Sequence, residues 1–173
     1  MIETPRLILR RWREEDRTPF VDLHQDPDVA YWLGGPRFLA KVGEAIDRYN
    51  ADIDSRGFSE FAVERRADGA MIGAVGVTEI HPNVPVQGFE ISWRLAKHAW
   101  GKGYAAEAAR AAAADAFAHG LEEILGLTSE PNLRSQAVMA RIGMGRDAAR
   151  DFDHPSLDPN HPLRRHQVWS LRR

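Results

Sequence analysis

A glycine-bearing segment between a strand pattern and a helix pattern constrains this chain more than any other feature. Residues 98–104 contain Gly101 and Gly103. They follow 89–95, where apolar and polar side chains alternate as in a strand with one buried and one open face. They lead into an alanine-rich helix pattern over 104–119. Glycines let successive N–H groups bend toward one point, and the first turn of a helix has unpaired N–H groups. The sequence therefore predicts an anion site, suited to a pyrophosphate, at the start of this helix.

Two other interpretations of this segment remain open. A plain glycine turn before a helix needs no ligand. Gly101-x-Gly103-x-x-Ala106 also matches the dinucleotide fingerprint, but that fingerprint follows a strand buried on both faces, almost directly. Here 89–95 alternates, and residues 96–100 intervene. The chain also lacks the succession of βαβ units of a doubly wound sheet. Dinucleotide binding is therefore the weaker alternative.

The remaining patterns predict one mixed sheet. Apolar periodicity, caps and turn residues predict helices over 14–24, 38–53, 104–119 and 132–142, and strands over 7–9, 58–64, 71–79, 89–95 and 124–128, with two more near 144–151 and 167–171. Short turns pair consecutive strands antiparallel, whereas a helix between two strands makes a crossover. We predict a single α/β domain over 1–173, with a mixed, mostly antiparallel sheet flanked by about four helices.

The composition excludes several chemistries. The chain has no cysteine, so it has no disulfide, no thiolate metal ligand and no cysteine nucleophile. A net charge of −2 argues against an extensive nucleic-acid surface. No stretch has the length and apolarity of a membrane span or a signal peptide, so we expect a cytoplasmic protein without a membrane partner. The His and Asp residues of 151–166 match no familiar zinc spacing, and we expect no metal.

A second motif lies downstream. Asn132 is a good N-cap, and Asn132, Ser135 and Met139 share one helix face. Alone, this pattern indicates a capped helix and nothing more. Together, however, W-G-K-G-Y-A-x-E-A at 100–108 followed by N-x-x-S…R-I-G-M resembles the GNAT acetyltransferases. The opening T-P-R-L-I-L-R and the D-P-D-V at 26–29 are similar to the RimJ/RimL-like branch of that family.

The resemblance covers nearly the whole chain and implies a GNAT-like fold with acetyl-CoA as co-substrate, no metal, and an amine acceptor. In the family, the glycine loop binds the pyrophosphate, and a bulged strand before it pairs its backbone with the pantetheine arm. The helix of the second motif, here 132–142, contacts the pantetheine and the sulfur. The cofactor-binding residues implied here are Trp93, Arg94, Leu95, His98, Gly101, Lys102, Gly103, Tyr104, Ala105, Asn132 and Ser135.

Two positions depart from the family pattern. His98 stands where many members have Gln or Arg, which weakens a phosphate contact. Met139 stands where many members have a tyrosine that protonates the leaving thiolate. A thioether cannot donate a proton. That role passes to Ser135, to water, or to no group at all.

The chemistry predicts further roles. Without a cysteine nucleophile, we expect an amine to attack the thioester directly in a ternary complex. Glu90, on the polar face of 89–95, is the candidate general base, and the backbone near Trp93 or Arg94 is the candidate oxyanion donor. The alternative is that Glu90 only pairs with Arg94 or another cation. Glu79 is a weaker candidate base, and we expect Glu107 to stabilise the first turn of its helix.

We predict an N-acetyltransferase that acts on a protein N-terminus or a small-molecule amine. A different acyl group remains open, and so does a non-catalytic CoA-binding or regulatory module. A homodimer is an expectation from the family. The aromatic residues that are candidates for lining an acceptor pocket are Trp12, Tyr31, Trp32 and Trp169.

Overall fold

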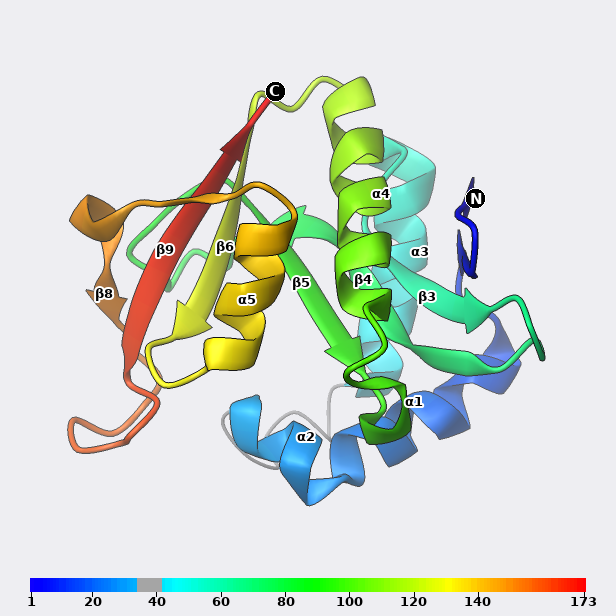
Figure 1. Cartoon of the computed structure of the whole chain (residues 1–173), viewed down its shortest axis with the longest axis horizontal. Helices are drawn as coiled ribbons and strands as arrows, with labels where there is room; N and C mark the ends of the chain where they lie inside the picture. Colours follow the sequence, from blue (N-terminus) through cyan, green and yellow to red (C-terminus); the bar gives the residue numbers. More distant parts are fainter. Residues whose placement is uncertain (34–41) are drawn as a thin grey trace.

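The computed structural model describes residues 1–33 and 42–173, and its helices pack on the two faces of one large twisted sheet (Figure 1). The strands are β1 (Ile2–Glu3), β2 (Leu7–Arg10), β3 (Glu60–Arg65), β4 (Met71–Glu79), β5 (Phe89–Leu95), β6 (Glu123–Ser129), β7 (Gly145–Arg146), β8 (Phe152–Asp153) and β9 (Arg165–Arg172). The α-helices are α1 (Arg17–Gln25), α2 (Pro27–Trp32), α3 (Val42–Arg56), α4 (Tyr104–Ala118) and α5 (Leu133–Arg141). Short 3₁₀ helices cover Glu14–Asp16, Lys97–Ala99 and Ala148–Arg150.

The sheet is mixed, as predicted. Its order is β1-β2-β3-β4-β5-β6-β9-β7, with β8 beside β9. Each neighbouring pair is antiparallel except β5 and β6, which run parallel because α4 makes the crossover between them. In Figure 1, α4 lies in front of the sheet and α3 behind it. The predicted fold class is confirmed.

The sequence expectations differ from the structure at several elements, and one expected helix is described only in part. Asp26 ends α1, but its side chain also accepts from the N–H of Asp28 at 2.9 Å and caps α2, which the sequence analysis missed. The described part of the chain therefore has five α-helices rather than about four. The first residues of the helix expected over 38–53 lie outside the described residues, and α3 is described from Val42. Within 144–151, only Gly145–Arg146 forms a strand.

Two apolar cores cover the central strands, one on each face, and a third apolar cluster lies around β6, β8 and β9. The larger lies between the sheet and α4, where small side chains such as Ala109 and Ala113 let the helix approach the strands closely. The smaller lies on the other face, where Phe20 and Tyr49 pack over the sheet. Strand β5 is consequently covered on both faces, and the guanidinium of Arg94 lies 5.5 Å from the ring centre of Phe20. The expectation of an open polar face on 89–95 is wrong, because the N-terminal helices cover it.

Strands β5 and β6 diverge soon after they meet. Among the described residues a single pair, Glu90 and Leu125, joins them. The partners of β5 on β4 continue without interruption from Phe89 to Leu95, and β9 pairs with β6 along its whole length. Each strand is thus held by its outer neighbour, and a gap opens between them (Figure 1). The unbroken register also shows that β5 has no bulge, contrary to expectation. The register shift lies between β3 and β4, at Val63/Glu64.

No helix among the described residues 1–33 and 42–173 has the length and apolarity that crossing a bilayer requires.

Gly76 in β4 permits a close approach between strands that a side chain would prevent. A Cβ added there would lie 2.0 Å from the carbonyl oxygen of Ser59 and 2.5 Å from Cα of Glu60. Because backbone atoms must shift, we expect Gly76→Ala to lower the free energy of unfolding by about 1–3 kcal/mol. Urea denaturation would measure the change. The matched control is Gly145→Ala, since a Cβ at Gly145 meets nothing within 4 Å. Equal stability of the two variants would contradict the prediction.

Candidate active site

The glycine segment forms an uncapped helix N-terminus. Gly101 and Gly103 have positive φ angles of 74° and 81°, a region that favours glycine. Gly103 is the N-cap of α4, and no side chain caps the helix there. The first intrahelical bond runs from the N–H of Glu107 to the carbonyl of Gly103. The N–H groups of Tyr104 and Ala105 therefore stand at the positive end of the helix dipole, where an anion binds favourably.

The N-terminal segment of the chain holds this loop in place through hydrogen bonds and an ion pair. Arg6 donates from Nη1 to the carbonyl of Lys102 at 2.9 Å and forms an ion pair with Glu107 at 2.6 Å. Thr4 donates from Oγ1 to the same carboxylate at 2.7 Å. The Arg6 guanidinium also lies 4.7 Å from the ring centre of Tyr104. Glu107 thus fixes the T-P-R segment to the loop, a role that the expectation of a helix-turn contact alone did not foresee.

Beyond Glu90, β5 has no strand partner among the described residues on the side of β6. The N–H of Ala96 donates to the carbonyl of Ile72 at 2.9 Å, so this position points toward β4. Antiparallel strands alternate, so the backbone of Arg94 also points toward β4 and that of Trp93 points into the gap. The carbonyl of Leu95 accepts from Nε1 of Trp100 at 2.7 Å. Of the two expected oxyanion donors, Trp93 therefore faces the gap, and Arg94 does not.

Glu90 lies where the two strands separate. Its side chain is only partly accessible. Burial raises the pKa of its carboxyl to about 7, the charge of Glu60 adds to the rise, and the charge of Arg94 opposes it. The alternative, an ion pair between Glu90 and Arg94, does not form, and Arg94 instead forms an ion pair with Glu60. A carboxyl that titrates near neutral pH at the end of a gap is suited to general-base work. Glu79, by contrast, forms an exposed ion pair with Arg56 at 2.9 Å.

The second motif borders the gap from α5. Asn132 accepts through Oδ1 from the N–H of Ser135 at 3.2 Å, so it does cap the helix. Ser135 is partly buried on the first turn. Met139 is 1% exposed and belongs to the larger core. A Cβ added at Gly126 of β6 would lie only 2.9 Å from its Cε. Met139 is therefore a packing residue in contact with β6.

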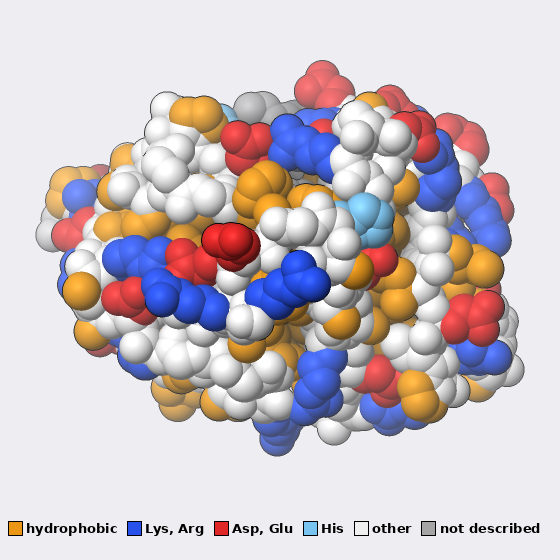
Figure 2. Space-filling view, turned by 90° about the horizontal axis from the view of Figure 1, so that it is seen from above, with side chains coloured by type: hydrophobic (Ala, Val, Ile, Leu, Met, Phe, Trp, Pro, Cys, Tyr) orange, Lys and Arg blue, Asp and Glu red, His pale blue; other side chains and the backbone are white. Residues whose placement is uncertain are grey.

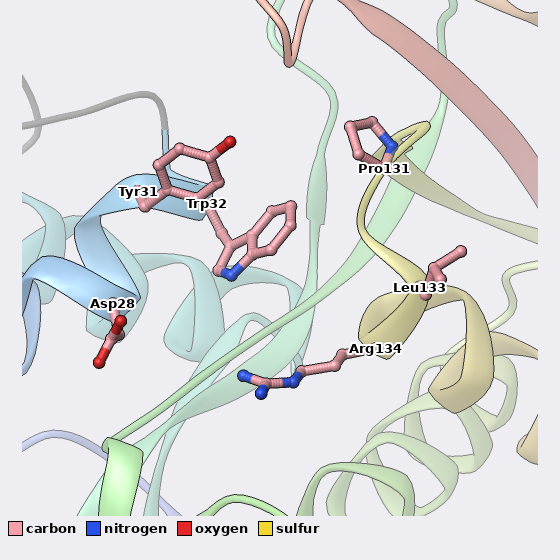
Figure 3. A pocket seen from close by; sticks show the side chains of 6 residues that line it. All are labelled: Asp28, Tyr31, Trp32, Pro131, Leu133 and Arg134. Carbon is pink, nitrogen blue, oxygen red and sulfur yellow. The ribbon is translucent and has the colours of Figure 1, made fainter.

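A groove of about 390 Å³ separates α2 from α5 (Figure 3). Its lining residues are Asp28, Tyr31, Trp32, Pro131, Leu133 and Arg134. In Figure 3 the indole of Trp32 and the guanidinium of Arg134 project into the space between the two helices. Tyr31 and Trp32 meet edge to face, with ring centres 4.9 Å apart. Of the four aromatic candidates, these two line the groove. Trp12 is instead buried and donates to the carbonyl of Glu60 at 2.7 Å.

Two contacts tie the glycine segment to this groove. Lys97 forms an ion pair with Asp28 of α2, and the guanidinium of Arg134 lies 4.9 Å from the ring centre of Trp100. His98 is exposed and lines a separate hollow of about 540 Å³ beside α1. Sequence reasoning did not identify Arg134, because an arginine on a helix surface is usually solvated.

The charged side chains outside the site form no single-sign surface on the face that Figure 2 shows. Lys and Arg side chains alternate there with Asp and Glu side chains. Within the described residues, no cluster of three or more His, Asp or Glu side chains is arranged to hold a metal ion.

Comparison with known proteins adds a consistent set of similarities. Residues 6–145 match the model of an acetyltransferase (GNAT) domain. The chain is 30% identical over 144 residues to YkkB of Bacillus subtilis, which covers 82% of this chain and 83% of that one. It is 31% identical over 153 residues to an FsC-acetyl coenzyme A-N(2)-transacetylase of Aspergillus fumigatus, covering 83% and 64% of the two chains. A solved acetyltransferase from Agrobacterium tumefaciens has a TM-score of 0.79 and 27% identity, over 99% of this chain and 94% of that one.

The raised pKa of Glu90 predicts a stability change with a definite sign. Its carboxyl titrates near 4.5 when unfolded and at about 7 when folded. Folding therefore favours the protonated form, and the wild type loses stability as the pH rises from about 4.5 through about 7. We expect Glu90→Gln to be more stable than the wild type at about pH 8, by at most about 3 kcal/mol, and equally stable near pH 4.5.

Urea denaturation at both pH values would measure this difference. Glu79→Gln is the matched control, because Glu79 is exposed. A gain for Glu90→Gln of the same size at both pH values, or a loss at the higher one, would contradict the prediction.

Proposed function

This chain belongs to the GNAT acetyltransferase family and is an acyltransferase, and from that premise we propose that it moves an acetyl group from acetyl-CoA directly to a primary amine in a ternary complex. One observation carries the proposal. The gap between β5 and β6 has Glu90 at its closed end, and the uncapped N-terminus of α4 follows β5 at its open end. Acetyl-CoA is an extended thioester with a pyrophosphate at its far end. Its thioester would lie near Glu90, and its pyrophosphate would lie at the start of α4.

In this proposal the glycine loop holds the pyrophosphate. The N–H groups of Gly103, Tyr104 and Ala105 donate to it, Gly101 allows the loop to bend, and Lys102 supplies charge at the rim. The ion pair of Arg6 with Glu107 supports the proposal, because it holds the loop in place.

The backbone of β5 and the first turn of α5 would hold the pantetheine arm between them. The C=O of Trp93 and the N–H of Leu95 pair with its amides, as a neighbouring strand would, which leaves the N–H of Trp93 for the reacting carbonyl. Asn132 and Ser135 contact the arm and the sulfur from α5. His98 and Arg94 would not contact the arm directly. His98 would lie beside the glycine loop, and Arg94 would act through its charge.

The residues around the gap then perform the chemistry. Glu90 takes the proton of the amine, directly or through a water, so that the nitrogen can attack the thioester carbonyl. The N–H of Trp93 stabilises the oxyanion that forms. As the C–S bond breaks, the hydroxyl of Ser135 or a water donates to the departing thiolate, since Met139 cannot. The acceptor would enter by the groove between α2 and α5, where Tyr31 and Trp32 provide an apolar wall.

Cofactor binding can be tested by thermal unfolding. We expect acetyl-CoA at 100 times its Kd to stabilise the chain by about 2.7 kcal/mol, which raises Tm by roughly 5–10 °C. NADH at the same concentration should leave Tm unchanged. A shift with NADH alone would instead favour the dinucleotide interpretation, and no shift with either ligand would exclude a working cofactor site.

The role of Glu90 can be tested by kinetics. We expect Glu90→Gln to lower kcat/KM for acetyl transfer by a factor on the order of 10² to 10⁴ and to leave the Kd of acetyl-CoA unchanged. In the wild type, kcat/KM should rise with pH through about 7, as the carboxyl loses its proton. Release of free thiol across a panel of amines provides the assay, with Glu79→Gln as the control.

Full activity of Glu90→Gln would remove Glu90 from the mechanism. Acetyl-CoA binding without turnover of any amine by the wild type would favour the non-catalytic module, consistent with Met139 at the tyrosine position.

A further inference from the structure

A second buried carboxylate lies on the face of the sheet that α1 and α3 cover, and alternation along β5 places Glu90 on that face, two residues before Ser92. Glu60 of β3 aligns with Gly76 of β4, and Gly76 aligns with Ser92 of β5. Because Gly76 has no side chain, the carboxylate of Glu60 extends across β4, and its Oε1 accepts from Oγ of Ser92 at 2.8 Å. The side chain of Glu60 is 2% exposed. A charge is buried at this depth only where a partner compensates it.

That partner is Arg94, two residues from Ser92 on the same face of β5. Its Nη2 donates to Oε2 of Glu60 and, at 2.8 Å, to the hydroxyl of Tyr49. The side chain of Arg94 is 10% exposed. Its Nη1 is 3.5 Å from Nε2 of His24 in α1. Two strands and two helices therefore fix the position of this ion pair, and neither charge can turn toward solvent.

Two other titratable groups, Tyr49 and His24, lie next to Arg94, and both are neutral. Burial raises the pKa of Tyr49 on α3 to about 12, so its phenol remains protonated at neutral pH. Burial lowers the pKa of His24 on α1, so its imidazole is uncharged at neutral pH. Among the described residues, Glu60 and Arg94 are the charged groups that shift the pKa of Glu90, and their effects are opposite. Removing the charge of Glu60 takes away the charge that raises the pKa of Glu90, and removing that of Arg94 takes away the charge that lowers it.

We propose that Glu60 and Arg94 are positioning residues for acetyl transfer, whose fixed and opposite charges decide in which protonation state Glu90 meets the acceptor amine. The inference rests on the proposed function only for its effect on turnover. The negative charge of Glu60 favours the protonated form of Glu90, and the positive charge of Arg94 favours the ionised form. The two charges act in opposite directions on a carboxyl whose pKa burial has already raised to about 7.

The test uses variants that unbalance the pair in opposite directions. Glu60→Gln leaves the charge of Arg94 uncompensated, and we expect the titration midpoint of Glu90 to fall by on the order of one pH unit. Arg94→Met leaves two carboxyls competing for protons, and the midpoint should rise by a similar amount. The double variant, Glu60→Gln with Arg94→Met, should return the midpoint toward the wild-type value.

Two controls keep the charges and remove only hydrogen bonds. Ser92→Ala and Tyr49→Phe each take one partner from the ion pair and should leave the midpoint in place. If the ion pair of Glu60 with Arg94 had only a structural role, every variant would be less stable. The titration midpoint of Glu90 would then not move in opposite directions.

The readout is the carboxyl carbon resonance of Glu90 in the full chain, labelled with ¹³C-glutamate and titrated by NMR from about pH 4 to about pH 9. Glu90→Gln assigns the resonance by removing it. Opposite shifts in the two single variants support the inference, and unmoved midpoints overturn it whether or not the chain turns over. If Arg94→Met does not fold, Glu60→Gln decides alone, since a midpoint that does not fall overturns the inference.

The pH dependence of kcat/KM separates this inference from the proposed function. If the NMR midpoints and the acid limb of kcat/KM move together, both are supported. If the midpoints move while turnover has no acid limb, the tuning of Glu90 is established and its role as the base is overturned.

Discussion

The single pair that joins β5 to β6 is the constraint on which the rest of the site depends. Had the two strands paired along their length, the backbone of Trp93 would be used within the sheet and no gap would exist. They diverge because each is held by its outer neighbour, β5 by β4 and β6 by β9. The site is therefore built by the sheet itself, and the helices supply the groups at its two ends. Glu90 stands at the closed end, and the start of α4 follows from the open end.

Several of these features could be predicted from the sequence because they depend on local patterns. Alternation identified β5, and the alanine run with its glycines identified α4 and the loop before it. The order of strands and one crossover then gave a mixed sheet. The two motifs together pointed to the family that the comparisons support. Local patterns also predicted that Asn132 caps α5, which it does.

The rest depends on contacts between distant residues, which no local pattern reports. The ion pair of Glu60 with Arg94 forms across a third strand, through the space that Gly76 leaves. In the sequence, Glu60 is one of three polar residues in 58–64, with Ser59 and Glu64, so no local pattern distinguishes it. The polar face of β5 was expected to meet solvent, because alternation cannot tell whether a helix covers that face. The bulge expected in β5 came from the family pattern, and the continuous register with β4 excludes it here.

The bracing of the glycine loop by Thr4 and Arg6 also has a consequence for biosynthesis. These residues leave the ribosome well before the carboxylate that they bind, which belongs to Glu107, 103 positions after Thr4. Strand β9, which holds β6 in place, is made later still. Contacts so distant along the chain form slowly, because the ends of a long loop must first meet. In a nascent chain, β4 would therefore hold the β5 side of the gap early, whereas the β6 side would be held only after β9 has been made.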